Sequence, residues 1–149
     1  MPDRKTILAE FRSNSLLCKQ LYDRTMEPIC EQYQITRMEL DILLFLANNP
    51  GYDTAKDIVE QKHFTKSHVS SSISLLEEKG YLERSFHPGN RKTVHLTPLP
   101  ASSEIIRAGQ AAQAKIFTKA FGSLTPEETA ALEQIFRKVS AAIREEFES

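Results

Sequence analysis

The chain has 149 residues, of which 40% are hydrophobic, and a formal net charge of -1. This length is enough for one core but short for two independent domains. The chain has no apolar run of about 18 residues, and its N-terminus leads into an amphipathic segment rather than a signal sequence. These features exclude membrane-spanning and secreted classes and predict a cytoplasmic protein with no membrane partner.

Residues 6–33 carry apolar side chains at helical spacing, and Pro28 is expected to kink this helix or to end it early. Thr36 then caps a second helix, Arg37 to Asn48, with Glu39 at the position that completes a capping box. A third, short helix is expected after Thr54.

The segment from Thr65 to Gly80 predicts the helix around which the rest is organised. Thr65 is its N-cap, and Gly80 supplies the left-handed residue that ends it. Val69, Ile73 and Leu76 form an apolar face, whereas five serines occupy other positions. Each serine costs roughly 0.5 kcal/mol in helix propensity relative to alanine. Short hydroxyls suit a face that enters a groove of base edges and phosphates, although surface serines without a function are the simpler explanation.

Two alternating segments follow, residues 81–86 and 93–97, with Pro88 and Gly89 where a type II turn requires them. They predict a hairpin whose tip carries Asn90, Arg91 and Lys92. Two short helices followed by a hairpin form the winged helix-turn-helix pattern, in which the second helix enters the major groove. Residues 54–97 hold seven lysines or arginines and five acidic residues, so positive charge gathers in this segment.

Beyond the hairpin, a helix is expected from about Ala101, and the sequence Gly122-Ser123-Leu124 should break it. Thr125 and Pro126 begin a last helix with near-heptad apolar spacing. One small winged core cannot cover terminal helices this apolar, so we expect a two-fold homodimer on a near-palindromic DNA site. The alternative is a monomer whose terminal helices fold back on its own core.

The order of these elements resembles the MarR family of bacterial transcriptional regulators. The resemblance rests on Leu76-Glu77-Glu78-Lys79-Gly80-Tyr81-Leu82-Glu83-Arg84 and on Asn90-Arg91-Lys92 at the place of the family's Asp-Arg-Arg wing tip. It implies a mainly α (α+β) fold: one domain over residues 1–149, with a DNA-binding part at 36–97 and dimerisation helices at 6–33 and 101–147. It also implies a homodimeric repressor that a small aromatic or phenolic effector releases from DNA.

On this interpretation the serines and His68 read bases, while Lys66, Arg91 and Lys92 hold phosphates or the minor groove of double-stranded DNA. The full set of predicted DNA-binding residues is Thr65, Lys66, Ser67, His68, Ser70, Ser71, Ser72, Arg84, Asn90, Arg91 and Lys92.

Two alternatives remain open. Leu17-Cys18-Lys19-Gln20-Leu21-Tyr22 resembles the sensor stretch of the family's organic-hydroperoxide-sensing branch, which would make Cys18 a redox sensor with Tyr22 beside it. Cys18 and Cys30 lie about 18 Å apart if both are in the first helix, so they are not a disulfide pair, and buried fillers are the ordinary explanation. The second alternative is a winged helix that docks a partner protein. Because no catalytic or cofactor motif is present and the spacing of His63 and His68 is weak for a metal, we expect no enzyme activity, cofactor or metal.

Overall fold

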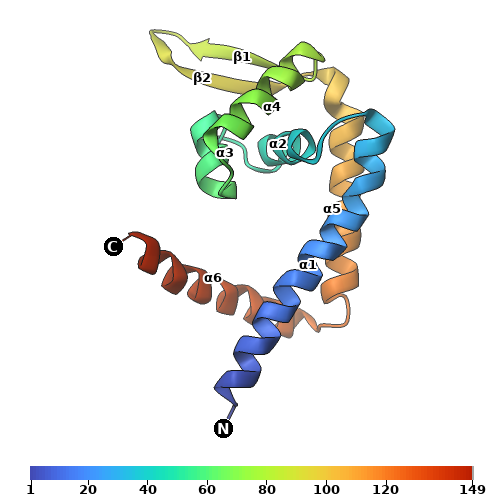
Figure 1. Cartoon of the computed structure of the whole chain (residues 1–149), viewed down its shortest axis with the longest axis vertical. Coiled ribbons are helices and arrows are strands. Elements are labelled where there is room, and N and C mark those ends of the chain that lie inside the picture. Colours follow the sequence, from blue (N-terminus) through green and yellow to red (C-terminus); the bar gives the residue numbers. More distant parts are fainter. Residues whose placement is uncertain (149) are drawn as a thin grey trace. The chain divides into compact units, whose positions relative to one another are not determined.

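The computed structural model describes residues 1–148. The elements in order are α1 (Arg4–Tyr33), α2 (Arg37–Asn48), α3 (Ala55–Lys62), α4 (Lys66–Glu78), β1 (Leu82–His87), β2 (Asn90–Pro98), a 3-10 turn η1 (Pro100–Ser102), α5 (Ser103–Phe121) and α6 (Pro126–Glu148), as Figure 1 shows. The predicted fold class, mainly helical with one small antiparallel sheet, is confirmed. The chain divides into two compact units, residues 1–113 and the part from Ala114 onward, and each is described by itself.

Local sequence signals set most of the helix boundaries. Thr36 and Glu39 form the predicted capping box of α2, and Thr54 forms an equivalent box with Asp57 at α3. The expectation for Pro28 was wrong in one respect, because α1 continues through it to Tyr33. A proline removes only one intrahelical hydrogen bond, and Met26 and Ile29 on either side are buried in the core, which holds this turn of the helix in place.

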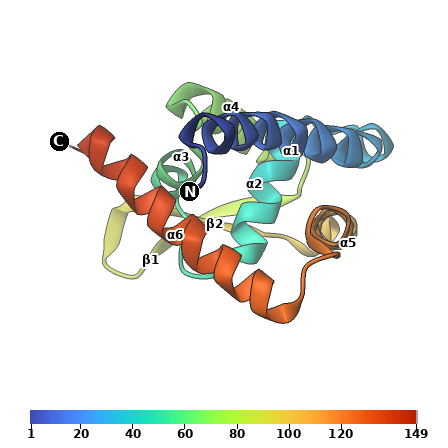
Figure 2. The same ribbon diagram turned by 90° about the horizontal axis from the view of Figure 1, so that it is seen from below.

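The core of the first unit is built around α2, where residues 42–46 are buried in succession. Helix α2 contacts α1, α4 and β2 (Figures 1 and 2). A close approach to α5 occurs at Gly109, where a Cβ atom would lie 2.7 Å from the Cδ2 atom of Leu44. Glycine is therefore required here by packing, because its φ angle is not in the left-handed region.

The β1–β2 hairpin is the wing, and its base is tied to the rest of the unit by main-chain hydrogen bonds. The Leu96 amide donates to the Asp53 carbonyl at 2.8 Å, and the Leu99 amide donates to the Tyr81 carbonyl at 2.9 Å. The strand register is irregular between Ser85 and His87, which lies next to the tip. The base of the wing is thus anchored to the loop that begins α3.

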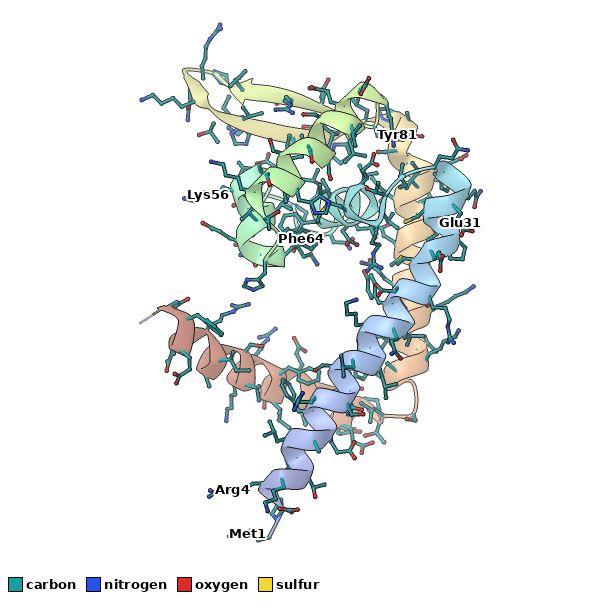
Figure 3. All side chains as sticks on the ribbon, in the orientation of Figure 1. Met1, Arg4, Glu31, Lys56, Phe64 and Tyr81 are labelled. Carbon is teal, nitrogen blue, oxygen red and sulfur yellow. The ribbon has the colours of Figure 1, made fainter. Side chains whose placement is uncertain are left out.

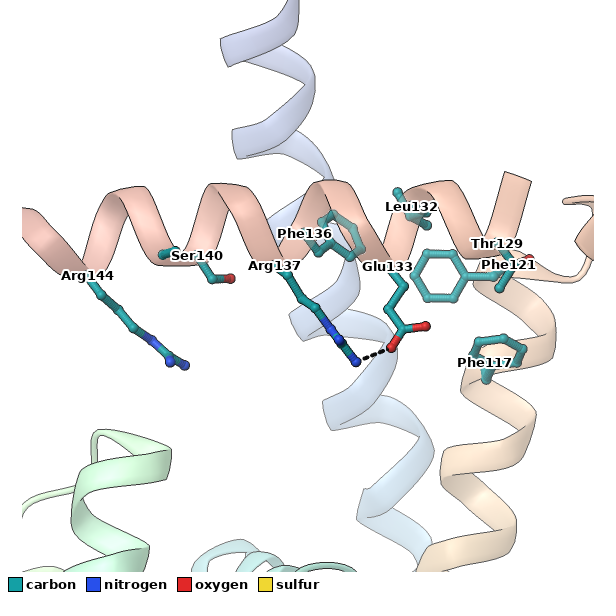
Figure 4. Close-up of a pocket in the computed structure, with 10 residues that line it drawn as sticks. Phe117, Phe121, Thr129, Leu132, Glu133, Phe136, Arg137, Ser140 and Arg144 are labelled. Atoms are coloured by element: carbon teal, nitrogen blue, oxygen red, sulfur yellow. Dashed lines mark hydrogen bonds and ion pairs between the residues drawn. The ribbon is translucent and has the colours of Figure 1, made fainter. Parts of the chain in front are cut away.

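The second unit comprises the end of α5 and all of α6. Thr125 caps α6 through a reciprocal pair of hydrogen bonds with Glu128, and Pro126 is its first residue, as predicted. Figure 4 shows an apolar groove of about 500 Å³ in this unit, over which Phe117, Phe121 and Phe136 gather. An ion pair between Arg137 and Glu133 lies at its edge.

Large apolar side chains remain exposed on both terminal helices. None of the described residues of α6 is buried, and the first half of α1, which begins at Arg4 in Figure 3, is exposed throughout. Exposed apolar side chains at 38% or more of their full surface include Ile7, Leu8, Phe11, Leu16, Leu17, Ile135, Phe136, Val139, Ile143 and Phe147. No described helix combines the length and apolar character that crossing a membrane would require.

Candidate nucleic-acid interface

Helix α4 has two faces with different chemistry. Val69, Ile73 and Leu76 are buried against α2 and α3, as the apolar spacing predicted. Ser67, Ser70, Ser71 and Ser74 recur at the same spacing on the opposite face and are exposed. Thr65, Lys66 and His68 at the start of the helix are exposed as well. The serine face is therefore a continuous polar strip without a partner element in the described chain.

Ser72 corrects the predicted set. It is only 4% exposed, because it lies three residues after Val69 and four before Leu76, on the apolar face. Its hydroxyl is therefore unable to reach a DNA base, and Ser72 is removed from the base-reading residues. The spacing that identified the core face already contained this information.

The hydroxyls of the serine face have internal partners in the free protein. Ser71 Oγ donates to the His68 carbonyl at 3.1 Å, and Ser74 Oγ donates to the Ser70 carbonyl at 3.2 Å. Thr65 Oγ1 caps the helix by accepting from the His68 amide at 3.3 Å. Serine hydroxyls bonded in this way keep acceptor capacity and can exchange a local bond for one to a ligand.

Arg84 joins the wing to this strip. Its Nη2 atom donates to Ser74 Oγ at 2.9 Å, and its Nε atom lies 3.4 Å from Glu77 Oε1. Since Arg84 is on β1 and both partners are on α4, these contacts place the wing strand along the side of the serine face. Arg84 thus has a positioning role that the sequence did not indicate.

The wing tip carries two exposed cations, Arg91 and Lys92. Within residues 1–148 neither side chain, nor that of Lys66, forms an ion pair, whereas Arg84 and Lys79 do. Gly89, at a φ of 80°, completes the turn as predicted. Asn90 Oδ1 accepts from the Lys92 amide at 3.0 Å and so fixes the backbone of the tip. Three cations are therefore available to an external anion.

These features were compared with known proteins. Residues 33–92, from the end of α1 to the wing tip, match the family model described as "MarR family". The chain belongs to the MarR family. No curated protein matches the chain in sequence.

Solved structures of MarR-family regulators share this fold. One from Listeria monocytogenes, complexed with 26mer DNA, has a TM-score of 0.80 at 16% identity over 98% of this chain and 92% of that one. Sco3205 from Streptomyces coelicolor, in complex with DNA, gives 0.75 at 19% identity over 96% and 92%. BpsR from Bordetella bronchiseptica, whose DNA binding is regulated by 6-hydroxynicotinic acid, gives 0.68 at 21% identity over 93% of both chains.

The predicted redox residues lie elsewhere in this MarR-family chain. Cys18 is exposed on α1, and both cysteines are free. The hydroxyl of Tyr22 accepts from Gln113 Nε2 at 2.8 Å, and the Arg37 guanidinium lies 4.6 Å from the Tyr22 ring centroid. Arg37 is itself paired with two aspartates, Asp23 at 2.8 Å and Asp41 at 2.9 Å. The nearby tyrosine and arginine are thus engaged with other groups.

Burial raises the pKa of the Cys30 thiol, and the Arg37 charge offsets this only in part. A raised pKa lowers the thiolate fraction at neutral pH, and the thiolate is the reactive form. Cys30 is therefore suited to the role of a packed side chain, as the ordinary explanation for the cysteines predicted.

Proposed function

We propose that this MarR-family protein is a homodimeric, sequence-specific DNA-binding transcriptional regulator, acting as a repressor in the cytoplasm. The observation that carries the proposal is the exposed serine face of α4, with His68 at its start and three unpaired cations, Lys66, Arg91 and Lys92, around it. Short hydroxyls and an imidazole can bond to base edges, and the cations can neutralise phosphates.

The residues divide into three roles. Ser67, His68, Ser70 and Ser71 would read bases in the major groove, and Thr65 would hold the start of the helix. Lys66, Arg91 and Lys92 would contact phosphates or the minor groove. Arg84 and Asn90 would hold the wing in position, because their side chains bond within the protein. The DNA-binding part would extend over residues 36–97.

Dimerisation would use residues 6–33 and 101–147. The support is the exposed apolar surface of both helical segments, which is too extensive for a monomer to leave in water. A two-fold dimer would bury this surface and would place two copies of α4 at successive major grooves, about 34 Å apart. Two of the similar structures are described as DNA complexes, which agrees with this use of the fold.

A small aromatic or phenolic acid is the effector class we propose. Tyr22 of α1, Arg37 of α2 and Gln113 of α5 form a polar junction between the helices assigned to dimerisation and the winged part. A ligand that competes for these contacts would change the spacing of the two recognition helices, provided that it binds one spacing better than the other. BpsR, which responds to 6-hydroxynicotinic acid, offers a precedent in the fold.

The experiment is selection of duplex DNA from a random pool by the full-length protein, followed by binding measurements at several salt concentrations. We expect an enriched site with two-fold symmetry, half-sites one helical turn apart, and a steep loss of affinity as salt increases. Sedimentation of the free protein should give twice the chain mass. No enrichment, or affinity for duplex DNA that does not depend on salt, would favour the protein-docking alternative.

A further inference from the structure

Three side chains that the DNA-binding proposal does not use meet at the base of the wing. Asp53 comes from the loop before α3, His87 from the end of β1 and His95 from β2. His95 Nδ1 and Asp53 Oδ1 are 2.8 Å apart, and the rings of His87 and His95 are stacked with centroids 3.5 Å apart and planes 2° from parallel. One ligand atom from each of the three lies within 4.8 Å of the other two.

We propose that Asp53, His87 and His95 form a binding site for a divalent transition metal of the zinc class. Two imidazoles and one carboxylate are a donor set that suits Zn²⁺ and excludes a preference for Mg²⁺ or Ca²⁺, which take oxygen ligands. The carboxylate supplies one negative charge, and three protein ligands leave one coordination position for water.

The geometry is close to that of a bound site. Ligand atoms 2.0–2.2 Å from a tetrahedral zinc lie about 3.3 Å from one another. The three groups therefore need only side-chain rotations, in which His87 tilts out of the stack and turns a nitrogen toward the ion. His87 is exposed and lies where the strand register is irregular, so its ring is free to turn.

The metal would replace the proton shared by His95 and Asp53 and would add His87 to a connection that already exists. The Leu96 amide already bonds to the Asp53 carbonyl, so β2 is held to the loop before α3. Coordination by His87 would join β1 to the same loop next to the Pro88-Gly89 turn. The site would thus fix the wing to the helix-turn-helix.

The test uses the untagged full-length protein, freed of metal by a chelator, in competition with a chromophoric zinc indicator at constant pH. We expect one equivalent of Zn²⁺ per chain and a loss of affinity of about tenfold or more in His87→Gln and in His95→Gln. The matched control is His63→Asn, because His63 is outside the cluster and asparagine tolerates its left-handed backbone, at a φ of 56°.

Two outcomes would overturn the proposal: no Zn²⁺ bound by the parent protein, or affinity unchanged in both cluster variants. Cobalt is a second probe, since Co²⁺ bound at this site should show visible bands without the thiolate charge-transfer band that Cys18 or Cys30 would give. Circular dichroism of each variant checks that the fold is retained. No DNA enters the experiment, so its result does not depend on the proposed function.

Discussion

Lys79, at the end of α4, donates to both carboxylate oxygens of Glu39, at the start of α2, at distances of 3.1 and 2.9 Å. Glu39 is completely buried, and its carboxylate also accepts from the Thr36 amide at 3.0 Å. Lys79 further donates to the carbonyl of Gln34, which ends α1, at 3.2 Å. One ammonium group therefore connects the ends of three helices.

Replacing Lys79 by methionine should lower the free energy of unfolding by about 2 kcal/mol, because a buried carboxylate would lose its cation. Lys79→Arg should lose much less, since it keeps the charge. The matched control is Lys56→Met, whose partner Glu60 is 3.9 Å away in an exposed pair, with an expected change below about 0.5 kcal/mol. Urea denaturation measures all three, and equal losses at positions 79 and 56 would contradict the argument.

Gly109→Ala should destabilise the protein by about 1 kcal/mol, although alanine is the better helix former. The added methyl would meet Leu44 side-chain atoms at 2.7 and 2.9 Å, and overpacking outweighs the propensity gain. In a Leu44→Val background the same change should be neutral or stabilising, because the δ-carbons are gone. Thermal denaturation of the four proteins in this cycle gives the coupling energy, and strict additivity would rule out the contact.

Ser71→Ala and Ser70→Ala should alter the base preference of the selected DNA site at particular positions, because their hydroxyls are exposed on α4. Ser72→Ala should leave the preference unchanged, because Ser72 is buried. Sequencing of the selected pools compares the three variants. If Ser72→Ala changed the preference as much as Ser71→Ala, the assignment of the two faces would be wrong.

Arg91→Ala should weaken binding to every duplex and flatten its dependence on salt. Each lost phosphate contact lowers the slope of log affinity against log salt by about 0.9, and a dimer would lose two such contacts. Arg4→Ala, an exposed arginine at the start of α1, is the control for total charge. A slope that stays constant in the Arg91 variant would show that this side chain does not contact phosphate.

Cys18→Ser should bind DNA and respond to an organic hydroperoxide as the parent protein does. The tyrosine and arginine near Cys18 are engaged by Gln113 and by two aspartates, so they are not available to stabilise a thiolate. DNA release measured by fluorescence anisotropy, with and without hydroperoxide, is the test. Release by the parent protein that the variant lacks would restore the redox-sensing alternative.

Sequence reasoning predicted the elements that have local signals. The capping residues Thr36, Thr54, Thr65 and Thr125 begin the helices at which they were placed, because an N-cap bonds to amides two or three residues away. Gly80 and Gly89 likewise have positive φ angles at the predicted ends and turns. Such features need no knowledge of the tertiary structure.

The features that were missed depend on residues far apart in the chain. Lys79 and Glu39 are 40 positions apart, and Asp53 and His95 are 42 apart, so no local pattern brings them together. The role of Arg84 depends on how the wing packs beside α4. Ser72 is different, because its helical spacing from Val69 was sufficient to place it in the core.

The hydrogen bond between the Leu96 amide and the Asp53 carbonyl has a consequence for how the hairpin moves. A two-stranded sheet is barely stable alone, so order in this one must spread outward from its attached end. Amide hydrogen exchange should therefore be slowest at Leu96 and progressively faster toward Arg91. The arginine would search the duplex on a short flexible strip whose root stays still.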